Sequence, residues 1–298
     1  MKKVVLFLIM SLLFAAVPVM EADASLVSDK IYRTEQRKEN KKMIKQIKSL
    51  FNEHNRYANQ HDLNGLETLY ADSYINNDGF NKEVYFKSIK ETWDSCNDLT
   101  YTTKITSIDI NGDYASVNVE EYADGTLRES SGFMDVTGEI HSKSTGIYHL
   151  VLVNDRWLIS GETSLTDESS LLYGDARFMN IEIQAPAQVN SGDVYTTTVK
   201  IDADSDTFIV GSIDRDSVTY PVTTPHSELR AMPQSQTLER LLKANTDNLN
   251  EYTVASLAIS KAKDVGGNNF RVYMAGLACV MKRVNVIPKN EYIKIEDK

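Results

Sequence analysis

The stretch 148–159, YHLVLVNDRWLI, decides how the amino-terminal half of this chain folds. Asn154 and Asp155 form a two-residue turn signal between two runs that are rich in Val, Leu and Ile. Such a turn between extended apolar runs is typical of an antiparallel hairpin. We therefore expect residues 144–153 to form a strand that pairs with residues 156–162.

A second hairpin is predicted upstream of this stretch. Residues 101–110 alternate in character, Asn111-Gly112 follows, and residues 114–122 alternate again. Asn-Gly is the strongest short hairpin signal because both positions tolerate positive φ. The polar residues 126–139 carry no clear pattern. Together the two hairpins predict an antiparallel meander of about four strands.

Three helices are predicted before the meander. Residues 34–61 repeat apolar side chains at three- and four-residue spacing, so they predict one long helix with an apolar stripe. His54 lies on this stripe, where we expect a hydrogen-bonded core histidine. A short helix follows around residues 66–70, and Asn81 can cap a third helix that runs to about Ser95. Helices followed by a meander indicate an α+β fold, with a sheet that curves around the first helix.

The quoted stretch also resembles a known family. Together with the long helix, the segment LYADSY at 69–74 and the turn DGFNKE at 78–83, it is similar to the nuclear-transport-factor-2-like (SnoaL-like) superfamily over residues 34–165. The resemblance implies a cone-shaped domain of helices and a curved antiparallel sheet, with a pocket at its open end. The superfamily contains isomerases, dehydratases, cyclases and many members without enzymatic activity, so the fold alone does not select a function.

The resemblance directs attention to side chains inside the cone. Enzymes of this fold place an acidic residue or a His–Asp pair there, and we expect Tyr74, Tyr85, Trp93 and His149 to line a ligand pocket. We assign no catalytic residue, but keep two candidates. His149 near a carboxylate could act as a general base. Asp78 lies in an Asn-rich turn, where hydrogen bonds to the backbone already explain it.

The carboxyl-terminal half has a different sequence pattern. A polar stretch at 166–177 predicts a linker, and short strands separated by turns over 178–288 predict an all-β sandwich. Leucines at helical spacing within 236–243 predict one short helix among these strands. The segment 185–195 resembles the opening of immunoglobulin-like domains of bacterial surface proteins, although the half contains no Trp. We expect residues 289–298 to be a tail.

One pattern in this half is typical of a cation site. Asp202, Asp204 and Asp206 have the spacing of the first three ligands of a calcium loop. The loop also needs Gly at its sixth position and Glu at its twelfth, and this chain has Thr207 and Ile213 there. We assign no metal site and keep the three aspartates as candidates. The chain contains no recognisable phosphate loop, nucleophile elbow or HExxH motif, and we expect no cofactor.

The first residues are typical of an export signal. Lys2 and Lys3 precede an apolar run over 4–19, and Ala22-Asp23-Ala24 forms a cleavage signal. We expect residues 1–24 to be removed and the protein to be an exported bacterial protein, periplasmic or extracellular, without membrane insertion after cleavage. The chain has a formal net charge of −10, which argues against a nucleic-acid partner. Two cysteines are too few for a disulfide framework, and we expect both to be free.

These observations favour an exported, non-catalytic protein. In this hypothesis the cone domain binds a small molecule or a protein, and the β-sandwich is a spacer or adhesion module. The alternative is a pocket enzyme of isomerase, dehydratase or hydrolase type that uses His149 with a nearby carboxylate. A second alternative is a structural envelope protein that forms a homodimer through the cone domain.

Overall fold

A computed structural model describes residues 18–131, 134–204, 206–221, 228–267 and 269–289, with side chains from residue 38 onward. Residues 1–17 of the predicted signal peptide lie outside this part, as do residues 290–298 of the predicted tail, so both stay predictions. The chain divides into two compact units, residues 1–50 and 51–298.

The first unit is helical wherever it is described. Helix α2 spans Pro18–Asn59, and so begins well before the predicted position 34. Its last turns, from Phe51 onward, belong to the second unit. No helix in the described residues is both long enough and apolar enough to cross a membrane.

Two further helices lie in the second unit. The third predicted helix is confirmed, whereas the short one lies earlier than the predicted residues 66–70, because Tyr70 already begins a strand. Helix α3 spans Leu63–Glu67 and helix α4 spans Lys82–Ser95. The side chain of Asn81 caps α4 by accepting a hydrogen bond of 3.0 Å from the backbone N–H of Val84. A polar cap of this kind satisfies an N–H group that has no partner inside the helix.

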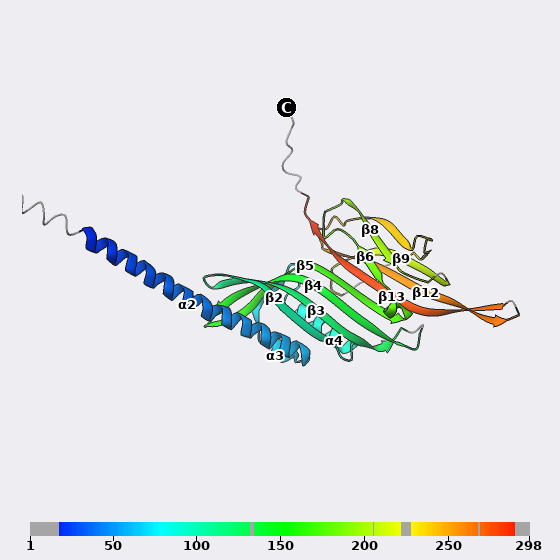
Figure 1. The fold of residues 1–298 in the computed structure, drawn as a ribbon, viewed down its shortest axis with the longest axis horizontal. Helices are drawn as coiled ribbons and strands as arrows, with labels where there is room; N and C mark the ends of the chain where they lie inside the picture. Colours follow the sequence, from blue (N-terminus) through cyan, green and yellow to red (C-terminus); the bar gives the residue numbers. More distant parts are fainter. Residues whose placement is uncertain (1–17, 132–133, 205, 222–227, 268, 290–298) are drawn as a thin grey trace, which may run out of the picture. The chain divides into compact units, whose positions relative to one another are not determined.

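Most of the described chain is β-structure, and one large sheet dominates it (Figure 1). The order of its main strands is β10-β9-β12-β13-β5-β4-β3-β2, with β1 pairing to β5 and β7 to β13. These strands are β1 Tyr70–Asn76, β2 Thr100–Asn111, β3 Tyr114–Ser130, β4 Thr137–Val153, β5 Arg156–Gly174, β7 Gln188–Asn190, β9 Thr207–Ser217, β10 Arg230–Ala231, β12 Glu251–Gly266 and β13 Asn269–Ile287.

The predicted fold class, an α+β cone followed by a separate all-β sandwich, is wrong. Strand β5 continues through residues 166–174, where the sequence predicted a linker, and a 3-10 turn follows at Asp175–Phe178. The second part of β5 pairs with β13, from Lys282↔Glu168 to Gly276↔Gly174. Because β5 also pairs with β4, one continuous antiparallel sheet joins both halves of the sequence.

A second, three-stranded sheet packs on part of the large one. It has the order β11-β8-β6, from strands Thr237–Lys243, Val194–Ile201 and Ile181–Gln184. Its apolar side chains share one buried cluster with those of β9, β12 and β13. The predicted helix at 236–243 is therefore strand β11. Leu238 and Leu242, four residues apart, share a helix face but equally share a strand face, and both are buried here.

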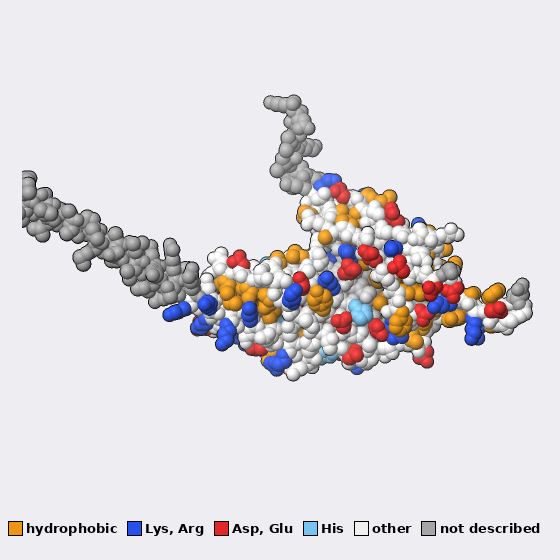
Figure 2. All heavy atoms as spheres, viewed as in Figure 1, with side chains coloured by type: hydrophobic (Ala, Val, Ile, Leu, Met, Phe, Trp, Pro, Cys, Tyr) orange, Lys and Arg blue, Asp and Glu red, His pale blue; other side chains and the backbone are white. Residues whose placement is uncertain are grey.

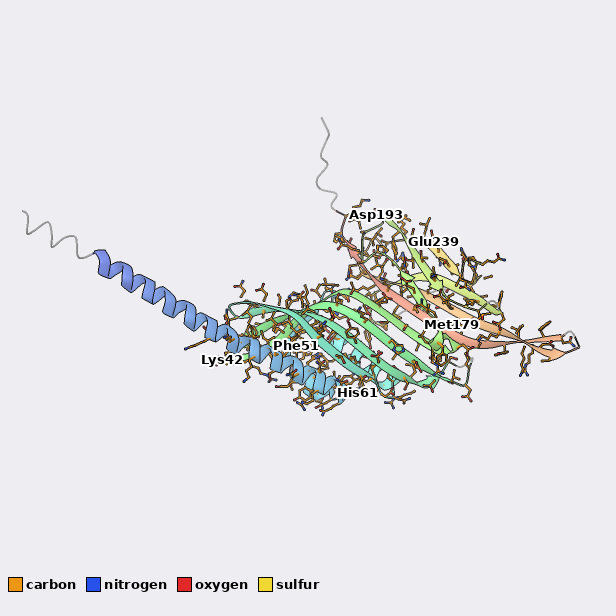
Figure 3. All side chains as sticks on the ribbon, viewed as in Figure 1. Lys42, Phe51, His61, Met179, Asp193 and Glu239 are labelled. Atoms are coloured by element: carbon orange, nitrogen blue, oxygen red, sulfur yellow. The ribbon has the colours of Figure 1, made fainter. Side chains whose placement is uncertain are left out.

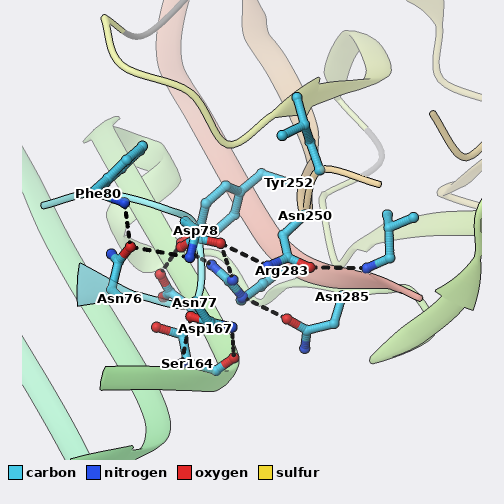
Figure 4. A network of polar contacts seen from close by, with 12 residues as sticks. Asn76, Asn77, Asp78, Phe80, Ser164, Asp167, Asn250, Tyr252, Arg283 and Asn285 are labelled. Atoms are coloured by element: carbon cyan, nitrogen blue, oxygen red, sulfur yellow. Dashed lines mark hydrogen bonds and ion pairs between the residues drawn. The ribbon is translucent and has the colours of Figure 1, made fainter. Parts of the chain in front are cut away.

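Buried polar contacts also join the two halves of the large unit (Figure 4). Asp78, in the turn between β1 and α4, forms a bidentate ion pair with Arg283 on β13, with distances of 2.5 and 3.1 Å. Asn250 donates to the same carboxylate at 2.8 Å. The side chains of Asp78 and Arg283 are only 6% and 1% exposed, so both charges depend on this pairing.

Candidate functional site

A cavity of about 170 Å³ lies between the helices and the inner face of strands β2–β5. Every element of the amino-terminal half except β1 contributes to its wall. The lining residues are His54, Ala58, Leu66, Tyr85, Ile89, Trp93, Tyr101, Thr103, Glu121, Tyr122, Ala123, Ser142, Ser144, Tyr148 and Glu162.

Helix α4 presents one face to the cavity. Tyr85, Ile89 and Trp93 are spaced four residues apart, so they follow each other along one side of the helix. The indole ring of Trp93 is held by a hydrogen bond and by a stacking contact. Its Nε1 donates to the hydroxyl of Tyr101 at 3.0 Å, and its ring stacks on His61 with centroids 4.9 Å apart.

Strand β3 places Glu121 in the cavity by simple alternation. Val117 and Val119 are buried on the inner face of this strand, and Glu121 is the next residue on that face. The Glu121 carboxylate accepts hydrogen bonds from the hydroxyls of Thr103 at 2.9 Å and Tyr148 at 3.1 Å. An acidic side chain therefore continues an otherwise apolar inner row.

Strand β5 places Glu162 in the cavity through a β-bulge. Ile159 pairs with Leu150 on the inner face, whereas Gly161 pairs with His149, so Ser160 is an extra residue in β5. The bulge reverses the alternation, and Glu162 points inward opposite Tyr148. Its Oε2 accepts hydrogen bonds from Tyr85 at 3.1 Å and from Tyr74 at 3.3 Å. Among the described residues, no group donates to Oε1.

Burial changes the acidity of both carboxyl groups. The loss of hydration is the largest cause and, together with the charge of Glu121, raises the pKa of Glu162 to about 7, against the lowering effect of the two tyrosine hydrogen bonds. The pKa of Glu121 is also raised, first by burial. The charge of one carboxyl group therefore disfavours ionisation of the other.

His54 closes the cavity from the side of α2. Its Nε2 lies 2.9 Å from the Tyr70 hydroxyl, which confirms the predicted hydrogen-bonded core histidine, but its ring also lines the cavity. Burial lowers the pKa of His54 to about 4, so the ring is neutral at pH 7. Phe51 and His61, labelled in Figure 3, lie on the same carboxyl-terminal segment of α2 and in the turn that follows it.

The wall combines aromatic rings with negative charge. Besides His54 it carries five rings, those of Tyr85, Trp93, Tyr101, Tyr122 and Tyr148. Neither Lys nor Arg occurs among the residues that line it in the described part of the chain. The two carboxyl groups thus face the cavity without a cationic partner.

The structure places only two of the four predicted pocket residues in the wall of the cavity. Tyr85 and Trp93 line the cavity, and Tyr74 lies behind it with its hydroxyl on Glu162. His149 is not in the cavity, because it lies on the opposite face of β4 from Tyr148, is exposed and bonds the Thr163 hydroxyl at 3.0 Å.

Asp78 does not reach the cavity either. Its carboxylate is held by Arg283 and Asn250. The backbone N–H groups of the turn are bonded instead by Asn76, whose Oδ1 accepts from Asp78 at 3.1 Å and Phe80 at 2.8 Å. Asp78 is thus a structural ion-pair partner.

Asp202 and Asp204 of the calcium-like pattern make separate contacts. Asp202 accepts a hydrogen bond from Asn180 at 3.0 Å and pairs with Lys200 at 3.5 Å, while the carbonyl of Asp204 accepts from the N–H of Thr207. In the part of the chain that the structure describes, no three His, Cys, Asp or Glu residues come together as a metal-binding group. The two cysteines are free, with Cys96 buried and Cys279 half-buried.

Comparisons with known proteins match part of the chain. No protein-family model matches the chain, and no curated protein matches it. Similar solved structures are NTF2-like and SnoaL-like proteins that cover about two fifths of the chain. The predicted immunoglobulin-like sandwich is not shown by these structures.

Three of these structures illustrate the range of the likeness. A scytalone dehydratase-like protein from Novosphingobium aromaticivorans is 14% identical, with a TM-score of 0.36, and covers 42% of this chain and 84% of its own. A hexachlorocyclohexane dehydrochlorinase from Novosphingobium barchaimii is 11% identical, with a TM-score of 0.35, and covers 42% and 86%. An NTF2-like superfamily protein from Salmonella enterica is 14% identical, with a TM-score of 0.33, and covers 40% and 87%.

Proposed function

We propose that the cavity binds a small organic cation, such as a quaternary ammonium or protonated amine. The observation that carries this proposal is the pair of carboxyl groups, Glu121 and Glu162, enclosed by aromatic rings with no cationic side chain in the described lining. Burying a carboxylate without a counter-charge is costly, and both pKa values are raised accordingly. A bound cation supplies the missing charge.

The aromatic wall suits the same class of ligand. A cation over the face of Trp, Tyr or Phe is attracted by the negative face of the ring, by about 0.5–2 kcal/mol per contact. Tyr85, Trp93 and Tyr148 line the cavity together with the carboxylates. A ligand with a spread positive charge and apolar methyl groups matches both parts of the wall.

The volume of the cavity limits the size of the ligand. A protein cavity of about 150 Å³ can hold a benzene molecule, and this cavity measures about 170 Å³. We therefore expect a ligand, or a ligand head group, of benzene size. Choline and trimethylamine are suitable probes on these grounds.

The test is a titration calorimetry measurement with choline and with 3,3-dimethylbutan-1-ol, its neutral isostere. We expect choline to bind, and the isostere to bind at least about tenfold more weakly because it has no charge to pair with the carboxylates. Glu162→Gln should weaken choline binding by at least about tenfold, because it removes one buried counter-charge.

Glu120→Gln is the matched control for this variant. Glu120 precedes Glu121 in β3 but pairs with Lys104 at 3.1 Å outside the cavity, so its loss should leave choline affinity unchanged. Equal affinity for choline and its isostere, or no binding of choline, would contradict the proposal.

A catalytic use of the cavity is the second candidate. A carboxyl group with a pKa near 7 is suited to general acid–base chemistry at neutral pH, and Glu162 has this property. His149 lies outside the cavity, so the enzyme hypothesis now rests on Glu162. If incubation of the wild-type chain with a bound amine yields a product that Glu162→Gln does not form, catalysis is favoured over binding alone.

Export also stays part of the proposal. The basic start, the apolar run and the Ala-x-Ala signal of residues 1–24 support it. An exported cavity of this kind would take its cation from outside the cytoplasm. Mass spectrometry of the amino terminus after expression in a bacterium would test the predicted cleavage after Ala24.

A further inference from the structure

The two carboxyl groups of the cavity occupy separate positions. Glu121 accepts hydrogen bonds from the hydroxyls of Thr103 and Tyr148, whereas Glu162 accepts from a different pair of tyrosine hydroxyls. Among the residues that the structure describes, no hydrogen bond joins one carboxyl group to the other. They are thus not a carboxyl pair that shares a single proton. When both are ionised, the cavity contains two negative charges.

The two carboxyl groups are nevertheless close enough for one small molecule to contact both. Glu162 pairs directly with Tyr148 in the register of β5 and β4, so it starts beside the backbone of that residue. Glu121 lies at the far end of the same side chain, 3.1 Å from the Tyr148 hydroxyl. Both line one cavity of about 170 Å³, and the charge of Glu121 is the next cause, after burial, that raises the pKa of Glu162. A ligand that fills this cavity therefore meets both groups.

Hydroxyl groups surround the Glu121 carboxylate. Thr103 donates to it at 2.9 Å, and Ser144, directly opposite Glu121 on β4, lines the same wall. Outside the lining, Asp167 accepts a hydrogen bond from Ser142 at 3.3 Å, and its charge adds to the effect of burial in raising the pKa of Glu121. A primary ammonium group has three N–H donors, so it needs several oxygen acceptors. The Glu121 side of the cavity therefore suits a primary amine.

Apolar side chains make up much of the remaining wall. Ala58, Leu66 and Ile89 line the cavity together with the aromatic rings. A hydrocarbon chain can lie against such side chains without leaving a polar group unpaired, whereas a polar chain would lose hydration there. The wall thus fits a molecule that is charged at its ends and apolar in its middle.

Carboxylates on the surface differ from those in the cavity in their surroundings. On the face shown in Figure 2, Lys and Arg side chains lie among Asp and Glu side chains. Outside the cavity, Glu120 pairs with Lys104 at 3.1 Å. The lining of the cavity includes neither Lys nor Arg in the described part of the chain. A ligand with one positive charge therefore compensates one carboxylate and leaves the other buried without a counter-charge.

We propose that the ligand is a short aliphatic diamine, with one ammonium group on Glu121 and the other on Glu162. This rests on the cation binding proposed above and specifies the class of cation. A primary amine has a pKa close to that of Lys, about 10.4, so both ends are charged at neutral pH. The diamine 1,4-diaminobutane has as many non-hydrogen atoms as benzene, which a cavity of about 150 Å³ can hold. It therefore fits the cavity and can compensate both carboxylates.

The experiment is titration calorimetry of the full chain at pH 8 with 1,4-diaminobutane and with 4-aminobutan-1-ol. The second probe has the same length but carries a hydroxyl in place of one ammonium group. At this pH the Glu162 carboxyl, whose pKa is raised to about 7, is mostly ionised. We expect the diamine to bind at least about tenfold more tightly than the amino alcohol, because only the diamine pairs with both carboxylates.

Three variants locate the two charges. Glu121→Gln and Glu162→Gln should each abolish the preference for the diamine, because one carboxylate remains to pair with one ammonium group. Glu120→Gln, outside the cavity, should keep the preference. A diamine preference that persists in either cavity variant overturns the inference.

Choline separates this inference from the proposed function. If choline binds and the wild type binds the two amines equally, the diamine inference fails while the proposed cation site stands. If neither choline nor either amine binds, both fail. The wild-type comparison needs no substituted chain, so it remains decisive even where a variant does not fold.

Discussion

At the scale of single residues, two carboxyl groups in one aromatic cavity dominate the molecule. Glu121 and Glu162 are held by hydroxyl groups, which stabilise a carboxylate but cannot neutralise it. Burial therefore remains the largest influence on both pKa values. When a charged ligand enters or leaves a site with such carboxyl groups, the site releases or takes up a proton.

This property leads to a pH dependence of cation binding. The pKa of Glu162 is raised to about 7, so the group is largely protonated below that pH and a cation must displace its proton. Choline affinity should rise with pH, falling about tenfold for each pH unit below 7 and levelling off above it. Titration calorimetry at pH 5.5, 6.5 and 8 checks this, and in Glu162→Gln the slope should be lost. An affinity independent of pH would contradict it.

From the sequence, the inward position of only one of these two residues, Glu121 and Glu162, could be predicted. Glu121 extends the inward row of Val117 and Val119, so alternation alone could have identified it. Glu162 could not be found in this way. Strict alternation from Trp157 and Ile159 points it outward, and no local pattern marks the extra residue, Ser160, that turns it inward.

At the scale of elements, helix α4 positions much of the cavity wall. Its start is fixed by the Asn81 cap, and Tyr85, Ile89 and Trp93 follow at regular spacing. Both the cap and the inward face were predictable, because each depends on local sequence. The hairpin turn at Asn154-Asp155 is confirmed for the same reason. The upstream hairpin is also present, but its turn lies one residue later than predicted, at Gly112-Asp113, because Asn111 pairs with Tyr114.

The cap yields a stability prediction. Asn81→Ala should lower the free energy of unfolding by about 1 kcal/mol, because the N–H of Val84 loses its hydrogen bond. Asn81→Asp should retain the stability, since a carboxylate can accept the same bond. Urea unfolding followed by circular dichroism measures both. A loss in Asn81→Asp as large as in Asn81→Ala would show that the cap is not the cause.

At the scale of the whole molecule, the large sheet joins segments that the sequence separates. The polar composition of residues 166–177 is typical of a linker, yet residues 166–174 continue strand β5 between β4 and β13. Polar side chains on a long strand are compatible with a sheet when backbone pairing is available on both edges. Such pairing depends on residues more than 100 positions away and leaves no local signal.

The buried ion pair between Asp78 and Arg283 gives a prediction at this scale. Asp78→Ala leaves the guanidinium buried and unpaired, so it should lower the free energy of unfolding by about 3–5 kcal/mol. Asp72→Ala removes a fully exposed partner of Lys82 and should leave the free energy of unfolding nearly unchanged. Urea unfolding of both variants measures the difference. Similar small effects in the two variants would mean that the pair does not join the halves energetically.

The two tryptophans give the protein an optical reporter of its own cavity. The chain contains Trp93 and Trp157 and no other tryptophan. Trp157 is 2% exposed and does not line the cavity, whereas Trp93 lines it. A change in intrinsic fluorescence on adding an amine would thus arise at Trp93. Because Trp157 can be replaced by Phe, one unlabelled variant would allow libraries of candidate cations to be screened in solution.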